Sequence, residues 1–335
     1  MADEPSVLTW QDGRVGRIRL NRPNALNALD LGMIRLIRGA LETWRHQPRV
    51  HAVVVDGAGD RAYCSGGDIR AMRAHSLAGE YDRVETFFRE EYALNLFIAE
   101  YPKPYVALID GVCMGGGIGV AVHGRIRVAT EAALLAMPET AIGFFPDIGA
   151  SWFLPRLPGA LGMFLSLTGT RLRGADAVHA GLATHYVPRA ALPELAAAIA
   201  RDGVATVAEH AASLPPFSLA PHRDAIDRCF GGDSVAGIVR GLEAEDSDWA
   251  RETLATLRQM SPASVLWSFA LLRRGADSSL AEALQAELAL TRRVVRHPDY
   301  LEGVRAMVVD KDRKPRWKAA RIEDVDPAEI AAVFA

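Results

Sequence analysis

The chain has 335 residues, half of them hydrophobic, which is enough for a large core in one domain or in a domain with a substantial appendage. The net charge is −3, with acidic and basic residues mixed along most of the chain, so no strongly basic face for nucleic acid is predicted. Three scattered cysteines, Cys64, Cys113 and Cys229, predict a reducing compartment and neither a disulfide framework nor a zinc site.

The sequence also lacks the usual marks of targeting or membrane insertion. The N-terminus, Met-Ala-Asp-Glu-Pro, is acidic and has no apolar run, so we expect no signal or transit peptide and a cytoplasmic protein. The most apolar stretch, residues 105–122, contains Asp110 and several glycines. A buried strand, turn and helix explains this stretch better than a membrane span.

The first predicted elements are a strand, a helix and a second strand. Apolar and charged residues alternate over 15–20, which predicts a strand with a wet face. A helix follows from about residue 27, which Asp30 or Asn27 could cap. Its apolar positions recur at helical spacing: Leu29, Met33, Leu36, Ile37, Leu41 and Trp44. The apolar run at 52–55 predicts a fully buried strand.

Strands and helices continue to alternate up to about residue 188, which predicts an α/β layer structure. We expect a helix over 80–99, strands at 105–109, 126–128 and 134–136, and helices at 191–210, 234–258, 262–274, 279–296 and 299–309. The strand signal fades after residue 190. We therefore predict an α/β core over 1–190 that carries the active site, and a helical C-terminal region over 191–335 in the same functional unit.

Two glycine-rich turns, at 63–68 and 114–119, each follow a strand and open a helix. Such a turn exposes backbone N–H groups that favour an anion, and two turns that face each other would hold a developing oxyanion. Glu139, in the run Met-Pro-Glu-Thr, then supplies a carboxylate. Two amides and an acid suit acyl chemistry.

Other catalytic patterns are missing. No Gly-rich stretch is followed by a Walker lysine, and no Gly-x-Ser-x-Gly elbow occurs. Carboxylate chemistry at Glu139 is therefore the leading option, although a Glu after Pro138 could also only complement a helix dipole. The basic cluster at 313–318 is explained either by a solvated face or by contact with a phosphorylated ligand.

At these residues the chain resembles the crotonase, or enoyl-CoA hydratase/isomerase, superfamily, and within it the 3-hydroxyisobutyryl-CoA hydrolase branch. The pieces that match run from about residue 8 to 318: 20–29, 62–69, the Met-Gly-Gly-Gly turn, 87–92 (FFREEY), 122–124, 137–147 (MPETAIGFFPD), 181–185, 302–306 and 310–312. The resemblance implies a crotonase-like α/β fold, a spiral of β-β-α units with a helical C-terminal region.

The resemblance also implies roles for individual residues. The N–H groups of Gly67 and Gly116 are expected to form an oxyanion hole for a thioester carbonyl. Glu139 is expected to be the catalytic carboxylate and Asp147 its acidic partner, although Asp147 could also be only an N-cap. Glu91 is expected to touch the polar end of the substrate. The expected substrate-binding residues are Glu91, Gly67, Asp68, Ile69, Arg70 and Gly116.

The function implied is hydrolysis of a short β-hydroxyacyl-CoA thioester, best 3-hydroxyisobutyryl-CoA from valine breakdown. Hydratases of the superfamily carry a second glutamate where this chain has Gly119, which favours hydrolase over hydratase. Two alternatives stay open: an enoyl-CoA hydratase or isomerase that uses Glu139 alone, and a non-catalytic crotonase-like scaffold. Coenzyme A enters as part of the substrate, no metal or other cofactor is expected, and the superfamily suggests a homotrimer or hexamer.

Overall fold

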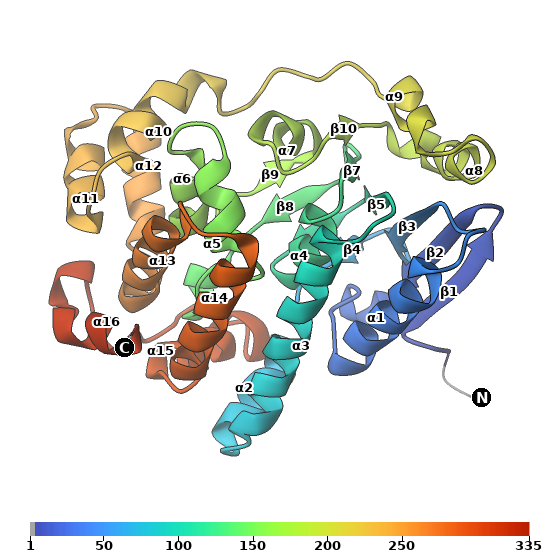
Figure 1. The fold of residues 1–335 in the computed structure, drawn as a ribbon. Helices are drawn as coiled ribbons and strands as arrows, with labels where there is room; N and C mark the ends of the chain where they lie inside the picture. Colours follow the sequence, from blue (N-terminus) through green and yellow to red (C-terminus); the bar gives the residue numbers. More distant parts are fainter. Residues whose placement is uncertain (1–3, 335) are drawn as a thin grey trace. The chain divides into compact units, whose positions relative to one another are not determined.

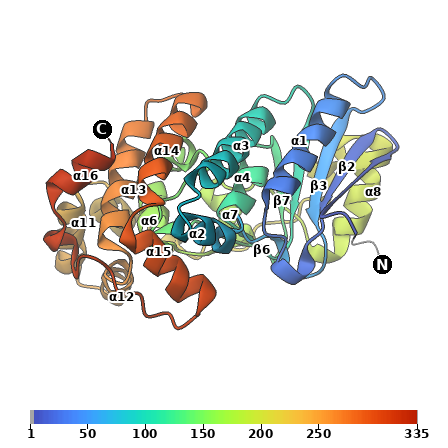
Figure 2. The same cartoon turned by 90° about the horizontal axis from the view of Figure 1, so that it is seen from below.

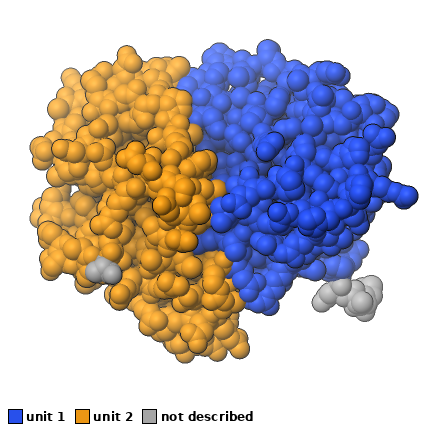
Figure 3. All heavy atoms as spheres, viewed as in Figure 1, with its two compact units in different colours: residues 1–67, 90–136, 172–218 blue, residues 68–89, 137–171, 219–335 orange. Residues whose placement is uncertain are grey.

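The computed structural model describes residues 4–334, which fall into two compact units (Figure 3). Unit 1 comprises the described part of residues 1–67 together with 90–136 and 172–218. Unit 2 comprises residues 68–89 and 137–171 with the described part of 219–335. Each unit thus combines three separate segments of chain. The predicted division at residue 190 follows chain order and stays a prediction.

Unit 1 contains two β-sheets (Figure 1). In the six-stranded sheet the order is β1 (Val7–Asp12), β2 (Val15–Leu20), β3 (Ala52–Gly57), β5 (Tyr105–Ile109), β7 (Ile126–Ala129) and β10 (His185–Tyr186). Only the β1–β2 pair is antiparallel. The four-stranded sheet has the order β4 (Ala62–Cys64), β6 (Val112–Met114), β8 (Leu134–Ala136) and β9 (Leu172–Arg173), with β8 and β9 antiparallel.

Successive strands of the chain alternate between these two sheets. β3, β5 and β7 lie in the large sheet, and β4, β6 and β8, which follow them in turn, lie in the small one. Helix α2 (Ile69–Leu77) follows β4, and helix α4 (Gly116–Val122) follows β6. This order is the predicted spiral of β-β-α units, and it places both glycine-rich turns directly after strands of the same small sheet.

Helices cover both faces of the six-stranded sheet (Figure 2). On one face, Val15 and Val54 belong to a core cluster with Leu195 and Ile199 of α8 (Leu192–Asp202). The opposite face packs on α1 (Leu31–Arg45), where a Cβ at Gly16 would clash with the Trp44 ring. Buried on both faces, the central strands carry the continuous apolar runs that the sequence shows.

The remaining helices of unit 1 are short. Helix α3 (Tyr81–Ala99) is divided between the units, because residues 81–89 belong to unit 2 and residues 90–99 to unit 1. The short helices are α7 (Gly174–Ala180) and α9 (Val207–His210).

Unit 2 is almost entirely helical, as predicted for the C-terminal part of the chain. Besides α2 its helices are α5 (Ala150–Phe153), α6 (Leu161–Thr168), α10 (Arg223–Phe230), α11 (Val235–Ala244), α12 (Asp248–Leu257), α13 (Pro262–Gly275), α14 (Leu280–Val294), α15 (Pro298–Val304) and α16 (Pro327–Val333), with a π-helical turn at Arg305–Val309. No helix among residues 4–334 combines the length and the apolar character that a membrane span needs.

The structure corrects several local predictions. Strand β1 was not predicted, because it is an edge strand whose residues after Val7 are largely solvated and show no alternation. The α1 cap is Asp30, which accepts a hydrogen bond from the Met33 N–H at 2.8 Å, and Asn27 instead has φ 56° and bonds to the Ala62 carbonyl. Leu36 is 46% exposed and does not belong to the buried face of the helix.

Candidate active site

The first glycine turn, in unit 1, is held by the segment that precedes α1. The Leu29 N–H donates to the Gly66 carbonyl at 2.8 Å, and the Ser65 N–H donates to the Leu26 carbonyl at 3.0 Å. Gly66 has φ 113°, a conformation that side-chain-bearing residues avoid. The turn therefore requires glycine at position 66, and it directs the chain from β4 to Gly67.

The second glycine turn packs directly on the first one. Gly115, with φ 47°, precedes α4, whose first residue is Gly116. An added Cβ at Gly66 would lie 3.2 Å from the Met114 carbonyl oxygen, and one at Gly116 would lie 3.2 Å from the Gly67 nitrogen. The two turns thus meet backbone to backbone, and the contact leaves little space for a side chain at either glycine.

Two N–H groups at this meeting point are left without an acceptor within residues 4–334. Among the residues that the structure describes, neither Gly67 N nor Gly116 N donates a hydrogen bond, whereas Gly115 N donates to the Ala136 carbonyl at 3.3 Å. Gly116 N is also one of the first N–H groups of α4, which a helix leaves unsatisfied. The predicted oxyanion glycines are therefore brought together, and their donors are available to a ligand.

Glu91 lies at the same place. Its side chain is 2% exposed, and a Cβ at Gly116 would collide with its carboxylate. Burial raises the pKa of the Cys64 thiol to about 12, and the negative charge of Glu91 contributes to this rise. The adjacent Glu90 forms a two-pronged ion pair with Arg35 on the surface, with both distances 2.7 Å. The structure thus brings Glu91, and not Glu90, to the glycine pair.

The predicted catalytic acids both lie in unit 2, in the loop between β8 and α5. Glu139 opens a 3₁₀ turn at Glu139–Ile142 after Pro138, and its side chain is 5% exposed. Asp147 follows Pro146 and is also 5% exposed. The N-cap of α5 is Gly149, without a side-chain cap, so the interpretation of Asp147 as an N-cap is wrong.

Buried aromatic rings surround the loop that carries these acids. Phe144 stacks on Phe145 at 4.4 Å between ring centres and on Phe88 at 5.4 Å, and it contacts Tyr300 at 5.7 Å. Burial raises the pKa of Tyr300, and the charge of Asp147 adds to this effect, which locates Asp147 near that ring. The loop is thus set in apolar surroundings, where electrostatic interactions are strong.

Three of the predicted substrate-binding residues, Asp68, Ile69 and Arg70, belong to unit 2 and lie at the start of α2. Asp68 is the N-cap of that helix, and its carboxylate accepts from the Ala71 N–H at 3.3 Å. Ile69 is the first residue of α2, and the exposed Arg70 donates to the Val308 carbonyl at 3.0 Å. Helix capping explains part of what Asp68 does, so its contact with substrate stays a prediction.

One carboxylate that the sequence analysis missed lies beside Asp147. Glu287 is fully buried in α14, and it accepts hydrogen bonds from the Gly149 N–H at 2.7 Å and from the Ser151 N–H at 3.0 Å. Burial raises the pKa of Glu287 to about 8, and the charge of Asp147 contributes to the rise. A signal was present, because Glu287 interrupts the apolar face that Leu284 and Leu290 define.

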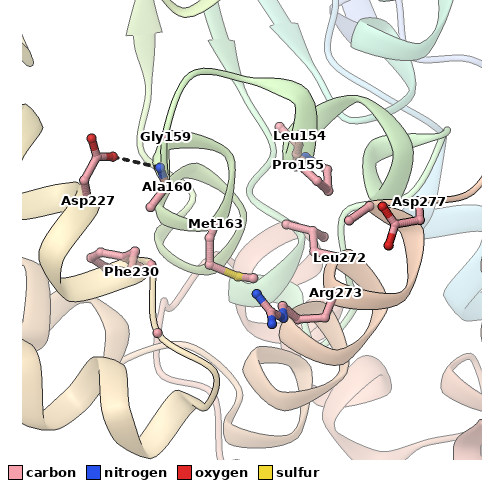
Figure 4. A pocket seen from close by; sticks show the side chains of 13 residues that line it. Leu154, Pro155, Gly159, Ala160, Met163, Asp227, Phe230, Leu272, Arg273 and Asp277 are labelled. Carbon is pink, nitrogen blue, oxygen red and sulfur yellow. Dashed lines mark hydrogen bonds between the residues drawn. The ribbon is translucent and has the colours of Figure 1, made fainter.

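Unit 2 also contains a cavity of about 610 Å³, whose lining differs from the predicted site (Figure 4). Met163, Phe230 and Leu272 give it apolar walls, and Arg273 and Asp277 add charges at its edge. None of the predicted site residues lines it. Within residues 4–334 no group of three or more His, Cys, Asp or Glu side chains is arranged to hold a metal ion.

The family model described as enoyl-CoA hydratase/isomerase matches residues 15–334. The chain therefore belongs to this family. A 3-hydroxyisobutyryl-CoA hydrolase, mitochondrial, from Xenopus tropicalis is 46% identical over 98% of this chain and 88% of that protein. The protein of the same name from Homo sapiens is 43% identical over 97% of this chain and 87% of its own length.

Solved structures agree with the fold. A structure titled enoyl-CoA hydratase from Rhodobacter sphaeroides matches with a TM-score of 0.93 at 41% identity, over 98% of this chain and 97% of that one. A structure titled carnitinyl-CoA dehydratase from Mycobacterium thermoresistibile matches with a TM-score of 0.95 at 40% identity, over 99% and 97%. The crotonase-like fold predicted from the sequence is confirmed.

Proposed function

We propose that this protein hydrolyses a short β-hydroxyacyl-CoA thioester, best 3-hydroxyisobutyryl-CoA, to free coenzyme A and 3-hydroxyisobutyrate, a step of valine breakdown. The observation that carries the proposal is the pair of N–H groups at Gly67 and Gly116 that donate to no described residue. Two such donors suit a carbonyl oxygen that gains negative charge in the transition state. The relatives named 3-hydroxyisobutyryl-CoA hydrolase, at 43–46% identity, support the acyl group.

In the proposed mechanism the thioester oxygen accepts hydrogen bonds from Gly67 and Gly116. Glu139 attacks the carbonyl carbon and expels coenzyme A as a thiolate, and water then opens the mixed anhydride. In the other form of the mechanism, Glu139 takes a proton from the attacking water. Asp147 directs the substrate hydroxyl or the water, and Glu91 contacts the polar end of the substrate.

Hydration or isomerisation of an enoyl-CoA is the second candidate, because two solved structures at 40–41% identity carry hydratase and dehydratase titles. Gly119, within the buried α4, offers no carboxylate at the position where hydratases of the superfamily carry their second glutamate. Hydrolysis needs no second acid at that position, so it is preferred.

The test measures both reactions on the same purified protein. Thiol release from 3-hydroxyisobutyryl-CoA is followed with a chromogenic disulfide, and hydration of crotonyl-CoA is followed by loss of the enoyl absorbance. We expect thiol release to be faster, and the reverse order would assign the protein to the hydratases. Activity is expected to survive dialysis against a chelator, since no metal takes part in the proposed steps.

Assembly and location are predictions of the same proposal. A trimer or hexamer is expected by light scattering, from the superfamily alone. The cytoplasmic location predicted from the sequence contrasts with the word mitochondrial in the names of the relatives, and cell fractionation decides between them.

A further inference from the structure

Glu287 uses both of its carboxylate oxygens to hold the start of α5. Oε2 accepts from the Gly149 N–H at 2.7 Å, and Oε1 accepts from the Ser151 N–H at 3.0 Å and from the Ser151 hydroxyl at 2.6 Å. The side chain is fully buried. A carboxyl group in an apolar helix face is costly to bury, so these three bonds are its compensation.

The segment that Glu287 holds has an unusual backbone. Ile148 has φ 58° and Gly149 has φ 86°, two successive positive values directly after Asp147. For a β-branched residue such as Ile148, this conformation is a true outlier that persists only when its surroundings impose it. Without Glu287, the N–H groups of Gly149 and Ser151 would be buried without acceptors, since no side chain caps α5.

Packing on the far side of α5 adds to this constraint. A Cβ at Gly275, the last residue of α13, would collide with the Ser151 carbonyl, so the two backbones are in direct contact there. Ser151 is thus held by α13 and α14 together. Asp147 therefore lies between Pro146, whose ring fixes its own φ, and a strained turn that cannot relax while Glu287 holds it.

We infer that Glu287 is a positioning residue: by holding the Ile148–Gly149 turn, it fixes Asp147 in the geometry that thioester hydrolysis requires. The catalytic part of the inference rests on the proposed function. The three hydrogen bonds from Gly149 and Ser151 to Glu287, called the clamp below, lie within unit 2 and do not depend on that function. A displacement of about 1 Å at a reacting group can cost on the order of 100-fold in rate. The alternative is a purely structural role, in which Glu287 stabilises α5 and does not affect catalysis.

The test is Glu287→Gln, which keeps the size but has one acceptor oxygen in place of two. One of the Gly149 and Ser151 N–H groups then faces an amide NH₂ and loses its acceptor. We expect kcat/KM for thiol release to fall by about 10- to 100-fold. Glu282→Gln is the matched control, since Glu282 lies on the same helix, is exposed and among the described residues forms side-chain hydrogen bonds only with Ser279. It should change kcat/KM less than twofold.

A double-variant cycle separates positioning from stability. In an Asp147→Asn background, Glu287→Gln should lower Tm as much as in the wild type but should no longer lower kcat/KM, because the group it positions is already altered. An equal loss of activity in both backgrounds, or a Tm loss with wild-type kcat/KM, overturns the inference. If Glu287→Gln fails to fold, Ser151→Ala removes one of the three bonds and should show a smaller loss of the same kind.

Failure of the clamp and failure of the proposed function are told apart by amide hydrogen exchange. The amides of Gly149–Ser151 should exchange faster in Glu287→Gln than in the wild type, and their exchange should not change in Glu282→Gln. This result does not depend on which substrate the protein hydrolyses. Unchanged exchange in Glu287→Gln would refute the clamp. If exchange rises and the wild type still releases no thiol from 3-hydroxyisobutyryl-CoA, the clamp stands, the proposed function fails, and the claim that Glu287 serves hydrolysis falls with it.

Discussion

Substituting Gly116 by alanine tests the oxyanion hole with the smallest possible change. The substitution keeps the Gly116 N–H and adds one methyl group. That methyl group would collide with the Glu91 carboxylate and would lie 3.2 Å from the Gly67 nitrogen. Because Glu91 is 2% exposed, it has little room to withdraw, so either its side chain or the start of α4 must move. Both changes disturb the geometry of the two donors.

The size of the effect follows from the two N–H groups. Removing one oxyanion donor costs about 10²–10³ in kcat, or about 2.7–4 kcal/mol of transition-state stabilisation. Alanine displaces the donors and partly covers the Gly67 N–H, but deletes neither, so we expect kcat to fall by about 10²-fold, the lower end of that range. KM should change less, since the donors act most strongly on the charged transition state.

The assay is thiol release from 3-hydroxyisobutyryl-CoA, accompanied by circular dichroism and Tm. Gly39→Ala, in the middle of α1, is the matched control, because an added Cβ there meets nothing within 4 Å; it should keep full activity. In a Glu91→Ala background, Gly116→Ala should lower Tm by less than it does in the wild type, since the colliding carboxylate is absent. A folded Gly116→Ala protein with near-normal kcat would remove Gly116 from the oxyanion hole.

Two further predictions concern the acids of unit 2. Glu139→Gln keeps the shape but cannot act as nucleophile or base, so kcat should fall by roughly 10²–10⁴; full activity would overturn the mechanism. Burial raises the pKa of Glu287 from 4.5 to about 8. Between these two pH values the folded protein therefore keeps the proton on Glu287, whereas the unfolded chain releases it. Its contribution to stability is therefore fully present below pH 4.5 and is lost as the pH rises through 8, a change of up to ~5 kcal/mol. Denaturant titrations should show the free energy of unfolding falling more steeply from pH 5 to pH 8 in the wild type than in Glu287→Gln. Parallel curves would mean that Glu287 is ionised throughout.

The glycine turns could be predicted from the sequence because the information is local. A buried strand followed by adjacent glycines indicates a tight turn with exposed N–H groups, and positive φ values at Gly66 and Gly115 confirm the need for glycine. The contact between the turns was not predicted, since the two short strands that bring them together, β4 and β6, were not among the predicted strands and pair only in the folded sheet. The choice of Glu91 over Glu90 came only from the resemblance, because two adjacent helical residues carry no sign of which one is buried.

The acids of unit 2 show where local rules stop. An aspartate followed by small residues is a normal N-cap signal, and it led to one interpretation of Asp147. In the structure the cap position belongs to Gly149, and the N–H groups that an N-cap would satisfy are bound by Glu287, more than 130 residues away in the sequence. No local pattern encodes that contact, because it depends on how α14 packs against α5. Since capping does not explain the burial of Asp147, a loss of activity in Asp147→Asn without a loss of stability would point to chemistry.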